Sequence, residues 1–311
     1  MKVSWILGIL LLAQQMIPND EIIVQQDKNT IAIIKNSDYI LPIPGGPFLN
    51  ISSYQQFLNQ LEKQIYIEPI NASIDDHGTI QPEQKGFILD RERFTAMLYD
   101  SFFQSGPKII DVPTHTLFPK VDTELLSTIR EQRIGHYVTY YNAGNKTRSH
   151  NIHLAAEAIN NQVIFPGETF SFNRTVGKRT KDKGYLLAPV IVKGELSEGI
   201  GGGICQVSST LFNAVDNAGL KIIQRYSHSK RVPYVPDGRD ATVSWYGPDF
   251  RFQNKFNQPI LIKAKTYEGI LVIMVFSSDL INYKPRKIPS ASHTLPEEIK
   301  VDLEINDSYM E

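Results

Sequence analysis

The chain has 311 residues, of which 41% are hydrophobic, and this length allows two domains that each bury a core. Its formal net charge of −1 at pH 7 excludes a strongly basic protein that would be drawn as a whole to nucleic acid or anionic membranes. Its single cysteine excludes an internal disulfide and any zinc site built from several cysteines.

The N-terminus has the pattern of a targeting segment. Lys2 is followed by an apolar run over residues 3–13, which is short for a membrane span. We therefore predict a signal peptide or signal anchor over residues 1–19. No pair of small residues marks a cleavage site before Met16, so an uncleaved tether stays open, as does a buried N-terminal helix.

Residues 20–130 predict a separate domain of mixed helices and strands. Helical periodicity appears over 54–64, 91–103 and 123–132, and Asp90 is placed to cap the second of these helices. Strands are expected around Gly and Pro turns over 65–67, 68–74, 78–90 and 108–112.

A second domain of mixed helices and strands is predicted over residues 131–280. The segment 281–311 is rich in Pro, Lys and Ser, and we predict that it is a mobile polar tail. Strands are expected over 134–141, 188–192, 220–228 and 241–245, with a final hairpin from 260–265 and 270–276. A polar turn over 145–150 should precede a helix over 151–159, and a second helix should follow the glycines at 201–203.

The cysteine lies at the start of that second helix. Cys205 follows the glycine run, and apolar positions then recur at helical spacing as far as Ala218. In the first turn of a helix, unpaired N–H groups and the helix dipole favour thiolate over thiol, which suits a nucleophile. The alternative is a small apolar residue that fills a gap beneath the turn.

Two further residues could complete a catalytic set. His228 is expected on or just after the next strand, and Asp240 opens the strand after that. If these elements pack together, His228 can act as base for Cys205 while Asp240 fixes its tautomer. Each also has a simpler interpretation: His228 as a structural or solvent-facing histidine, and Asp240 as a carboxylate that caps a turn.

These segments resemble a known family. The region from about 134 to 277 is similar to the VanW family, which is named after an accessory protein of vancomycin-resistance operons. The matching segments lie at 148–152, 165–173, 176–177, 184–185, 201–211, 225–228 and 234–241. Residues 20–130 resemble a peptidoglycan-binding domain that often precedes VanW domains, which implies binding to the cell wall; a spacer or packing role is the alternative.

The order of Cys, His and Asp also resembles the core of transglutaminase-like, or papain-like, cysteine enzymes. This resemblance implies an α+β fold in which the Cys-bearing helix of the second domain packs on a mainly antiparallel sheet.

Six further residues in the matching segments are expected to contact substrate. They are Gly202, Gly203, Gln206, Ser208, Arg148 and Tyr234. The glycines would let a substrate backbone approach Cys205, or would only form a tight turn. The basic runs at 178–183 and 230–231 could face an anionic polymer, but such runs are more often solvated loops.

No cofactor or metal is expected. His150 and His153 are three residues apart on a helix, but no third ligand stands at metal-site spacing. We predict an exported, extracytoplasmic bacterial protein of the cell envelope whose partner is peptidoglycan or another wall polymer. Nucleic acid is excluded as a partner, and membrane contact is limited to the N-terminus. The function is either a cysteine enzyme that hydrolyses or transfers amides, or a non-catalytic wall-binding or scaffold protein.

Overall fold

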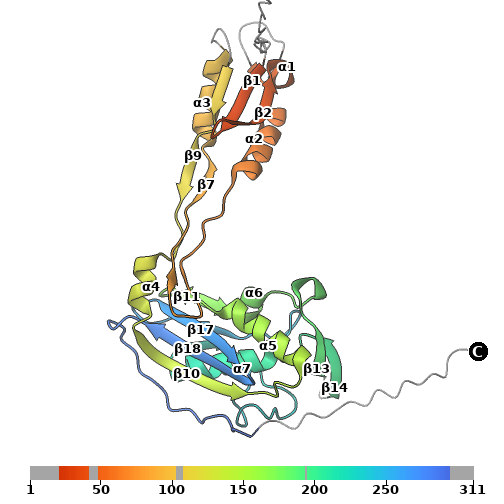
Figure 1. Cartoon of the computed structure of the whole chain (residues 1–311), viewed down its shortest axis with the longest axis vertical. Helices are drawn as coiled ribbons and strands as arrows, with labels where there is room; N and C mark the ends of the chain where they lie inside the picture. The colour runs from red at the N-terminus through yellow and green to blue at the C-terminus, as the bar shows by residue number, and fades with distance from the viewer. Residues whose placement is uncertain (1–20, 42–47, 103–107, 193–194, 295–311) are drawn as a thin grey trace, which may run out of the picture. The chain divides into compact units, whose positions relative to one another are not determined.

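The computed structural model describes residues 21–41, 48–102, 108–192 and 195–294 (Figure 1). The signal segment predicted over 1–19 lies outside these ranges. The chain forms two compact units, of which the first comprises Met1–Asn71 and Glu83–Lys120 and the second comprises Ala72–Pro82 and Val121–Glu311. The second unit therefore includes two segments, 72–82 and 121–130, that the sequence analysis assigned to the first domain.

The first unit combines a three-stranded sheet with two helices. The sheet has the order β2-β1-β8, from β1 (Glu21–Gln26), β2 (Asn29–Lys35) and β8 (Lys108–Asp111). Helices α2 (Ile51–Ile65) and α3 (Arg91–Phe102) supply half of the buried core residues, and the Asp90 carboxylate accepts from the Arg93 N–H at 3.0 Å, as a cap should. The predicted helices at 54–64 and 91–103 are confirmed.

Short elements complete the first unit. They are α1 (Asn36–Tyr39), the paired strands β3 (Ile40–Leu41) and β4 (Phe48–Leu49), and the paired strands β7 (Gly86–Leu89) and β9 (Thr114–Leu117).

An antiparallel sheet of order β10-β18-β17-β11 forms the centre of the second unit. Its strands are β10 (Gln132–Tyr140), β18 (Ile270–Ser277), β17 (Ile260–Tyr267) and β11 (Gln162–Ile164). The predicted final hairpin is confirmed as β17 and β18. The preceding helix α4 (Thr123–Ile129) ends earlier than expected, because Gln132 already begins β10.

The alternation of residues along β17 gives the sheet two packed faces. Ile260, Ile262 and Ala264 belong to the main core of the unit, whereas Leu261 packs with α4. Lys263 points to the same side as Leu261 and donates to the Ile74 carbonyl at 2.8 Å. Ile74 belongs to the small hairpin β5 (Ser73–Ile74) and β6 (Ile80–Gln81), which is fixed to the sheet in this way.

Helices α5 (Lys146–Ile159) and α7 (Ile204–Asn217) contact each other and the sheet (Figure 1). Helix α5 begins where a polar turn was predicted over 145–150. That prediction is wrong because the Asn145 side chain accepts from the Arg148 N–H at 3.1 Å, which lets the helix start at Lys146.

The remaining elements surround α7. Strands β12 (Thr169–Ser171), β16 (Arg251–Gln253) and β15 (Lys221–Gln224) form a sheet in the order β12-β16-β15, and β13 (Leu187–Val192) pairs with β14 (Glu195–Ile200). Two short helices are α6 (Phe172–Val176) and a 3₁₀ turn at Lys181–Lys183. The strand predicted over 220–228 ends at Gln224, and no strand forms over 241–245.

The segment after β18 differs from the mobile tail expected to begin at residue 281. Ile281 and Ala291 are buried against the main core. The Tyr137 hydroxyl donates to the Pro289 carbonyl at 3.0 Å, and Arg286 lies 2.5 Å from the Asp216 carboxylate. The tail is therefore part of the packed unit as far as residue 294, where the described residues end.

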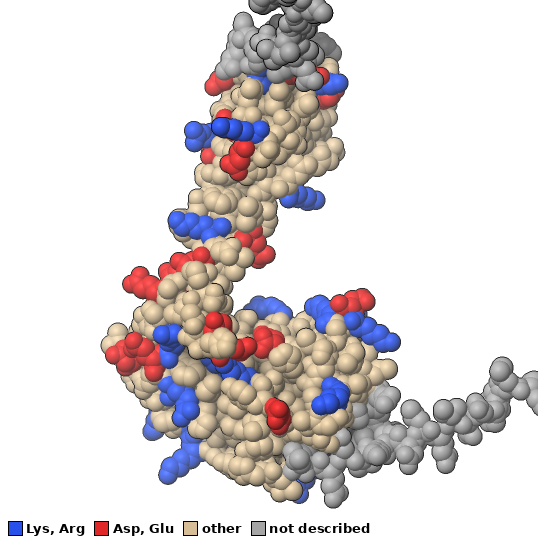
Figure 2. All heavy atoms as spheres, viewed as in Figure 1, with Lys and Arg blue, Asp and Glu red and all other residues tan. Residues whose placement is uncertain are grey.

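Acidic and basic side chains are interspersed on the face of each unit that Figure 2 shows. Within the described ranges, none of the helices has the length and apolar character needed to cross a membrane.

Candidate active site around Cys205

Cys205 is the second residue of α7, and Gly203 precedes the helix with φ +107°. From Ile204 to Asp216 every residue of the helix is buried except Cys205. The cysteine is therefore the point at which this buried helix meets solvent, and it lies in the first turn, where the helix dipole favours an anion.

The glycine turn before Cys205 is held by α5. The Asn151 amide donates to the carbonyls of Gly202 at 3.1 Å and Leu186 at 2.9 Å. A methyl group at Gly203 would lie 2.8 Å from Arg148 Nη1, so the turn also needs glycine for space. Its position relative to α5 is thus fixed by both hydrogen bonds and close packing.

His228 and Asp240 lie together on the loop that follows β15. The Asp240 carboxylate is 2.7 Å from His228 Nδ1, and the same oxygen accepts from the His228 backbone N–H. The two side chains are only 7% and 9% exposed. This bond to Nδ1 leaves Nε2 as the ring nitrogen available to a second partner.

The Cys205 thiol is close enough to this histidine for the two groups to influence each other's pKa. Burial opposes a charged thiolate, but the nearby His228, together with contacts to Val243 and Thr242, outweighs burial and lowers the pKa of the Cys205 thiol. Burial likewise opposes a charged imidazole, yet Cys205 and Asp240 together raise the pKa of His228. Both shifts favour a thiolate beside an imidazolium.

The Cys205 sulfur also contacts the loop that carries Asp240. It lies 3.6 Å from the Val243 carbonyl and 3.8 Å from the Thr242 hydroxyl. These contacts place the sulfur at the end of the segment 240–243, which begins with Asp240, the partner of His228.

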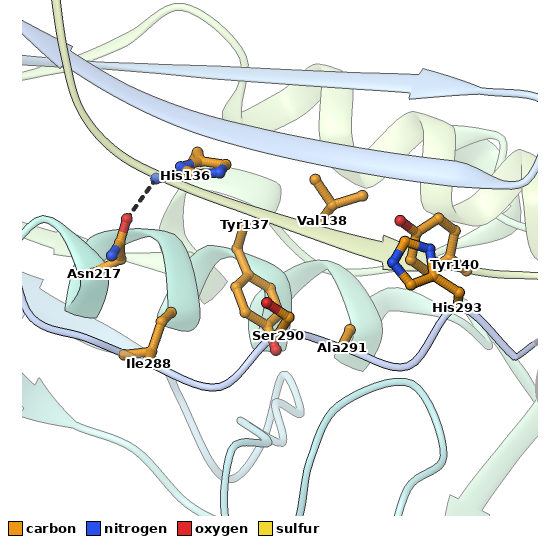
Figure 3. Close-up of a pocket in the computed structure, with 9 residues that line it drawn as sticks. All are labelled: His136, Tyr137, Val138, Tyr140, Asn217, Ile288, Ser290, Ala291 and His293. Carbon is orange, nitrogen blue, oxygen red and sulfur yellow. Dashed lines mark hydrogen bonds between the residues drawn. The ribbon is translucent and has the colours of Figure 1, made fainter.

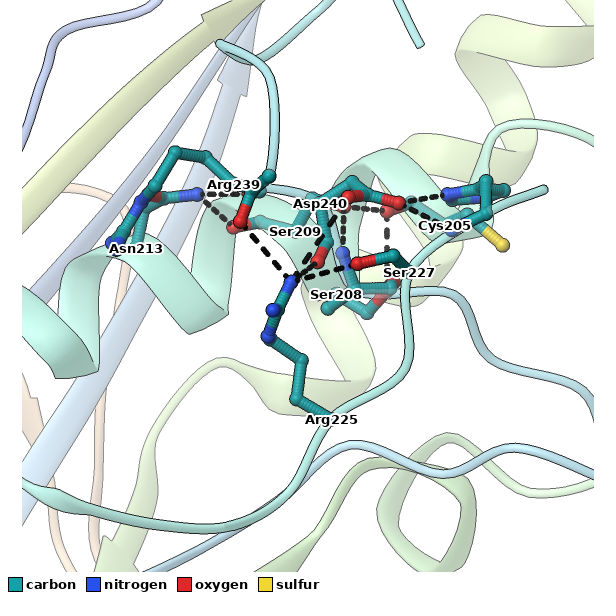
Figure 4. Close-up of polar contacts among 11 residues, drawn as sticks. Cys205, Ser208, Ser209, Asn213, Arg225, Ser227, Arg239 and Asp240 are labelled. Atoms are coloured by element: carbon teal, nitrogen blue, oxygen red, sulfur yellow. Dashed lines mark hydrogen bonds and ion pairs between the residues drawn. The ribbon is translucent and has the colours of Figure 1, made fainter. Parts of the chain in front are cut away.

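Two buried serines fix that segment to the helix. Ser209 accepts from the Ala241 N–H at 2.8 Å, and its hydroxyl donates to the Cys205 carbonyl at 2.7 Å. Ser208 donates to the Ala241 carbonyl at 2.5 Å. As a result Asp240 is held beside the first turn of α7, as Figure 4 shows.

One turn further along the helix, Asn213 continues this network (Figure 4). Its amide donates to the Arg239 carbonyl at 2.8 Å, and its oxygen accepts from Arg239 Nε at 2.7 Å. Arg239 also pairs with Asp216 at 2.8 Å. The sequence analysis missed these residues, although a polar stripe at positions 209, 213 and 216 of an otherwise apolar helix was a signal for a bound loop.

The substrate-contact predictions fare differently. Gln206 and Ser208 are fully buried and hydrogen-bond within the protein: Gln206 accepts from Arg148 at 2.7 Å and donates to the Tyr140 carbonyl at 3.0 Å. These bonds give both residues a structural role, and no part of either side chain is exposed for contact with substrate in this structure. Gly202 is also buried, and its carbonyl is bound to Asn151.

Tyr234 is 8% exposed and interacts with Cys205 and Ser209, and burial raises its pKa well above the ordinary value. Arg148 and Gly203 lie beside the same turn. Contact of these three residues with substrate remains a prediction.

Two other features lie apart from this site. A pocket between β10 and the segment 288–293 is lined by His136, Tyr137, Val138, Tyr140, Asn217, Ile288, Ser290, Ala291 and His293, and none of the three candidate catalytic residues lines it (Figure 3). His150 binds the Gly184 carbonyl at 2.9 Å and His153 the Thr266 hydroxyl at 3.0 Å. In the described part of the chain, no three His, Cys, Asp or Glu side chains gather as a metal site.

These features define a two-unit α+β protein whose second unit carries a Cys–His–Asp cluster. Two stretches of the chain match known protein families. Residues 147–276 match the family described as "VanW like protein", and residues 24–111 match the family described as "Putative peptidoglycan binding domain".

Two relatives extend this result. "Uncharacterized protein YoaR" of Bacillus subtilis (strain 168) is 56% identical over 297 residues, which cover 96% of this chain and 98% of the relative. "Vancomycin B-type resistance protein VanW" of Enterococcus faecalis (strain ATCC 700802 / V583) is 38% identical over 109 residues, which cover 33% of this chain and 40% of that protein. No solved structure matches the chain.

The chain therefore belongs to the VanW family, with a domain of the peptidoglycan-binding family ahead of its VanW-like region.

Proposed function

We propose that this protein is a cell-envelope enzyme that uses Cys205 to cleave or transfer an acyl group of an amide in wall material. The observation that carries the proposal is the arrangement around α7. Cys205 is the solvent-accessible residue of a buried helix start, and it is coupled to His228, which is in turn held by Asp240 at 2.7 Å.

The chemistry follows from these contacts. The Cys205 thiolate attacks the acyl carbon, and an S–C bond forms as the C–N bond breaks. His228 gives its proton to the departing amine, while Asp240 holds the ring and its charge. Water or an amine then attacks the thioester with His228 as base, which releases an acid or a new amide and restores the thiol.

The cell-wall setting is supported by the family matches. One relative is named as a vancomycin resistance protein, and the first unit matches a family described as peptidoglycan-binding. An extracytoplasmic location agrees with the signal segment predicted over residues 1–19. We therefore assign peptidoglycan or an attached wall polymer as the substrate.

A transglutaminase-like core is part of the same proposal. Its support is the chain order of a cysteine at a helix start, then a histidine, then an aspartate that binds the histidine ring. In this chain the last two residues lie on a loop and not on paired strands, so the likeness rests on the order and contacts of the side chains.

The direct test is incubation of the protein with purified peptidoglycan and with its soluble peptide fragments. Mass spectrometry would detect hydrolysed or transferred peptides, and an amine-reactive dye would detect new amines. The wild-type protein should generate them, while Cys205→Ser and Cys205→Ala should not, with unfolding midpoints near that of the wild type. Equal turnover in the cysteine variants would reject the proposal.

The alternative is a non-catalytic wall-binding or scaffold protein. The match of residues 24–111 to a peptidoglycan-binding family is the observation that favours it. In sedimentation with insoluble peptidoglycan, a binder would retain its affinity in Cys205→Ser and would generate no product in the incubation above.

A further inference from the structure

One cation of the basic run at 178–183 does not face solvent. Lys178, Lys181 and Lys183 are exposed, as a solvated loop predicts. Arg179 instead turns inward, and its terminal nitrogens Nη1 and Nη2 each expose less than 1 Å². Among the described residues neither nitrogen has a hydrogen-bond partner.

The Arg179 side chain lies at the Cys205 site. Its guanidinium is 5.7 Å from the centre of the Phe172 ring, and a methyl group at Gly201 would lie 3.2 Å from its Cβ and Cγ. Its charge also interacts with that of Cys205. The cation is thus next to the glycine turn from which the thiol projects.

Among the described residues, no carboxylate forms an ion pair with this cation. The neighbouring acid is Asp249, whose carboxylate already accepts from the Ser171 hydroxyl at 2.7 Å and the Asn173 N–H at 2.9 Å. Burial lowers the pKa of Arg179 more than the nearby Cys205, Tyr185 and Asp249 raise it. Burying a guanidinium without hydrogen-bond partners costs free energy, and a bound anion that accepts its hydrogen bonds would remove that cost.

We propose that Arg179 binds a carboxylate of the substrate beside the amide that Cys205 attacks. This inference rests on the proposed function and names its substrate class: a peptide with a carboxylate close to its reacting amide. The planar guanidinium fork matches a carboxylate through two parallel N–H···O bonds.

A carboxylate fits the site better than a phosphate. One guanidinium supplies one positive charge, which balances a carboxylate but leaves a doubly charged phosphate with an excess. Two exposed aromatic residues also follow Val243, whose carbonyl contacts the Cys205 sulfur: Trp245 and Tyr246 are 41% and 82% exposed. These side chains provide apolar surface for the rest of a peptide.

The test compares two thiol reagents of nearly equal size on the full chain. Iodoacetate carries a carboxylate, and iodoacetamide is its neutral analogue. In the wild type, iodoacetate should alkylate Cys205 faster than iodoacetamide, against the usual order for an isolated thiolate. Arg179→Gln should slow iodoacetate about tenfold, since a charge-assisted pair is lost, and should change the iodoacetamide rate about twofold or less.

Lys181→Gln is the matched control, because it removes the same charge from an exposed residue of the same basic run. It should leave both rates unchanged. Sodium acetate should slow iodoacetate labelling more than inorganic phosphate does at equal ionic strength; the reverse order would overturn the carboxylate assignment. Equal slowing of both reagents in Arg179→Gln would also overturn it, because Arg179 would then act on the thiol itself.

A second measurement separates this inference from the proposed function. It uses only the wild-type protein, so its result does not depend on whether a variant folds. If neither reagent labels folded Cys205, the nucleophile proposal fails. Titration of the wild type with acetate, followed by the NMR signal of Arg179 Nε–H, then decides the anion site alone. A saturating shift supports it, and no shift overturns it.

Discussion

One oxygen of Asp240 accepts hydrogen bonds from both the backbone and the ring of His228. Burial raises the pKa of Asp240, but these bonds outweigh it and lower that pKa, so the carboxylate stays charged and favours a protonated ring. Because the folded pKa of His228 is raised, its contribution to stability is complete below the unfolded value of 6.5 and is lost as pH rises through the folded value.

Asp240→Asn should therefore lower the pKa of His228, since the attraction to a negative charge is removed. An NMR titration of the imidazole signals measures this directly. The control is Asp237→Asn in the same loop, because Asp237 is exposed and pairs with Arg231 at 2.6 Å on the surface. If both variants shift His228 equally, the Asp240 contact has no special part in holding the charge.

Gly203 is the second residue on which the site depends. Gly203→Ala should destabilise the fold, because φ +107° is unfavourable for alanine and the new methyl group would lie 2.9 Å from Ile152 Cγ1. The control is Gly78→Ala, at φ +83° with nothing within 4 Å, where the backbone cost alone is about 1–2 kcal/mol. Overpacking should cost Gly203→Ala about 1–3 kcal/mol more in urea unfolding. Equal losses would show that the turn can relax away from α5.

At the scale of elements, α7 holds the loop that carries His228 and Asp240. Ser209 and Asn213 face this loop, while Thr210 on another face bonds Thr139 of β10 at 2.8 Å. The helix thereby connects the loop that carries His228 and Asp240 to the central sheet, and the position of Asp240 depends on polar groups that are fully buried.

Asn213→Ala should cost about 1–3 kcal/mol of unfolding free energy, because it leaves the Arg239 partners buried without their hydrogen bonds. It should also slow alkylation of Cys205, since the loop loses its anchor. Asn282→Ala is the control at an exposed asparagine, with an expected change within about 0.5 kcal/mol. A stable Asn213→Ala protein with unchanged alkylation would show that the serines alone position the loop.

Elements with strong local patterns could be predicted from the sequence. The helices at 51–65, 91–102 and 204–217 and the hairpin of β17 and β18 follow from apolar periodicity and nearby caps. Strands were predicted over 220–228 and 241–245 with a turn between them, but the structure has a loop from 225 to 244. Its backbone is instead bound by side chains of α7, which a local pattern does not reveal.

The same distinction applies to the site. The three candidate catalytic residues stand out by type and order, and the structure brings them together. Arg179 could not be predicted, because a run of basic residues does not show which member turns inward. Gln206 and Ser208 were predicted to bind substrate, but both side chains are buried and hydrogen-bond within the protein, which their positions in the sequence do not reveal.

At the scale of the whole molecule, contacts distant in sequence complete the second unit. Lys263 is 6% exposed and bonds Ile74, which lies 189 positions away, and also Asn161 at 2.9 Å. The segment 281–294 packs against the main core through Ile281 and Ala291. Neither contact has a local signature, which explains why the expected domain boundary and tail differ from the structure.

Lys263 gives the folded unit a pH dependence. Burial lowers its pKa from 10.5 to about 8, so the folded protein binds fewer protons than the unfolded chain between these values. Stability should therefore rise with pH from about 8 to 10.5, and Lys263→Met should remove this rise. Lys255→Met, at an exposed lysine, should keep it. Chemical unfolding at several pH values measures the effect, and parallel profiles for all three proteins would contradict it.

The most direct test of the account is the rate of Cys205 alkylation by iodoacetamide as a function of pH. The thiolate reacts, so the midpoint of the profile reports the pKa of the thiol. We predict a midpoint well below the free-thiol value of about 8.5. His228→Ala should move it upward, because burial is then opposed only by the contacts with Val243 and Thr242, while His153→Ala, at an exposed histidine, should not. A wild-type midpoint at or above the free value, unchanged in His228→Ala, would contradict an activated nucleophile.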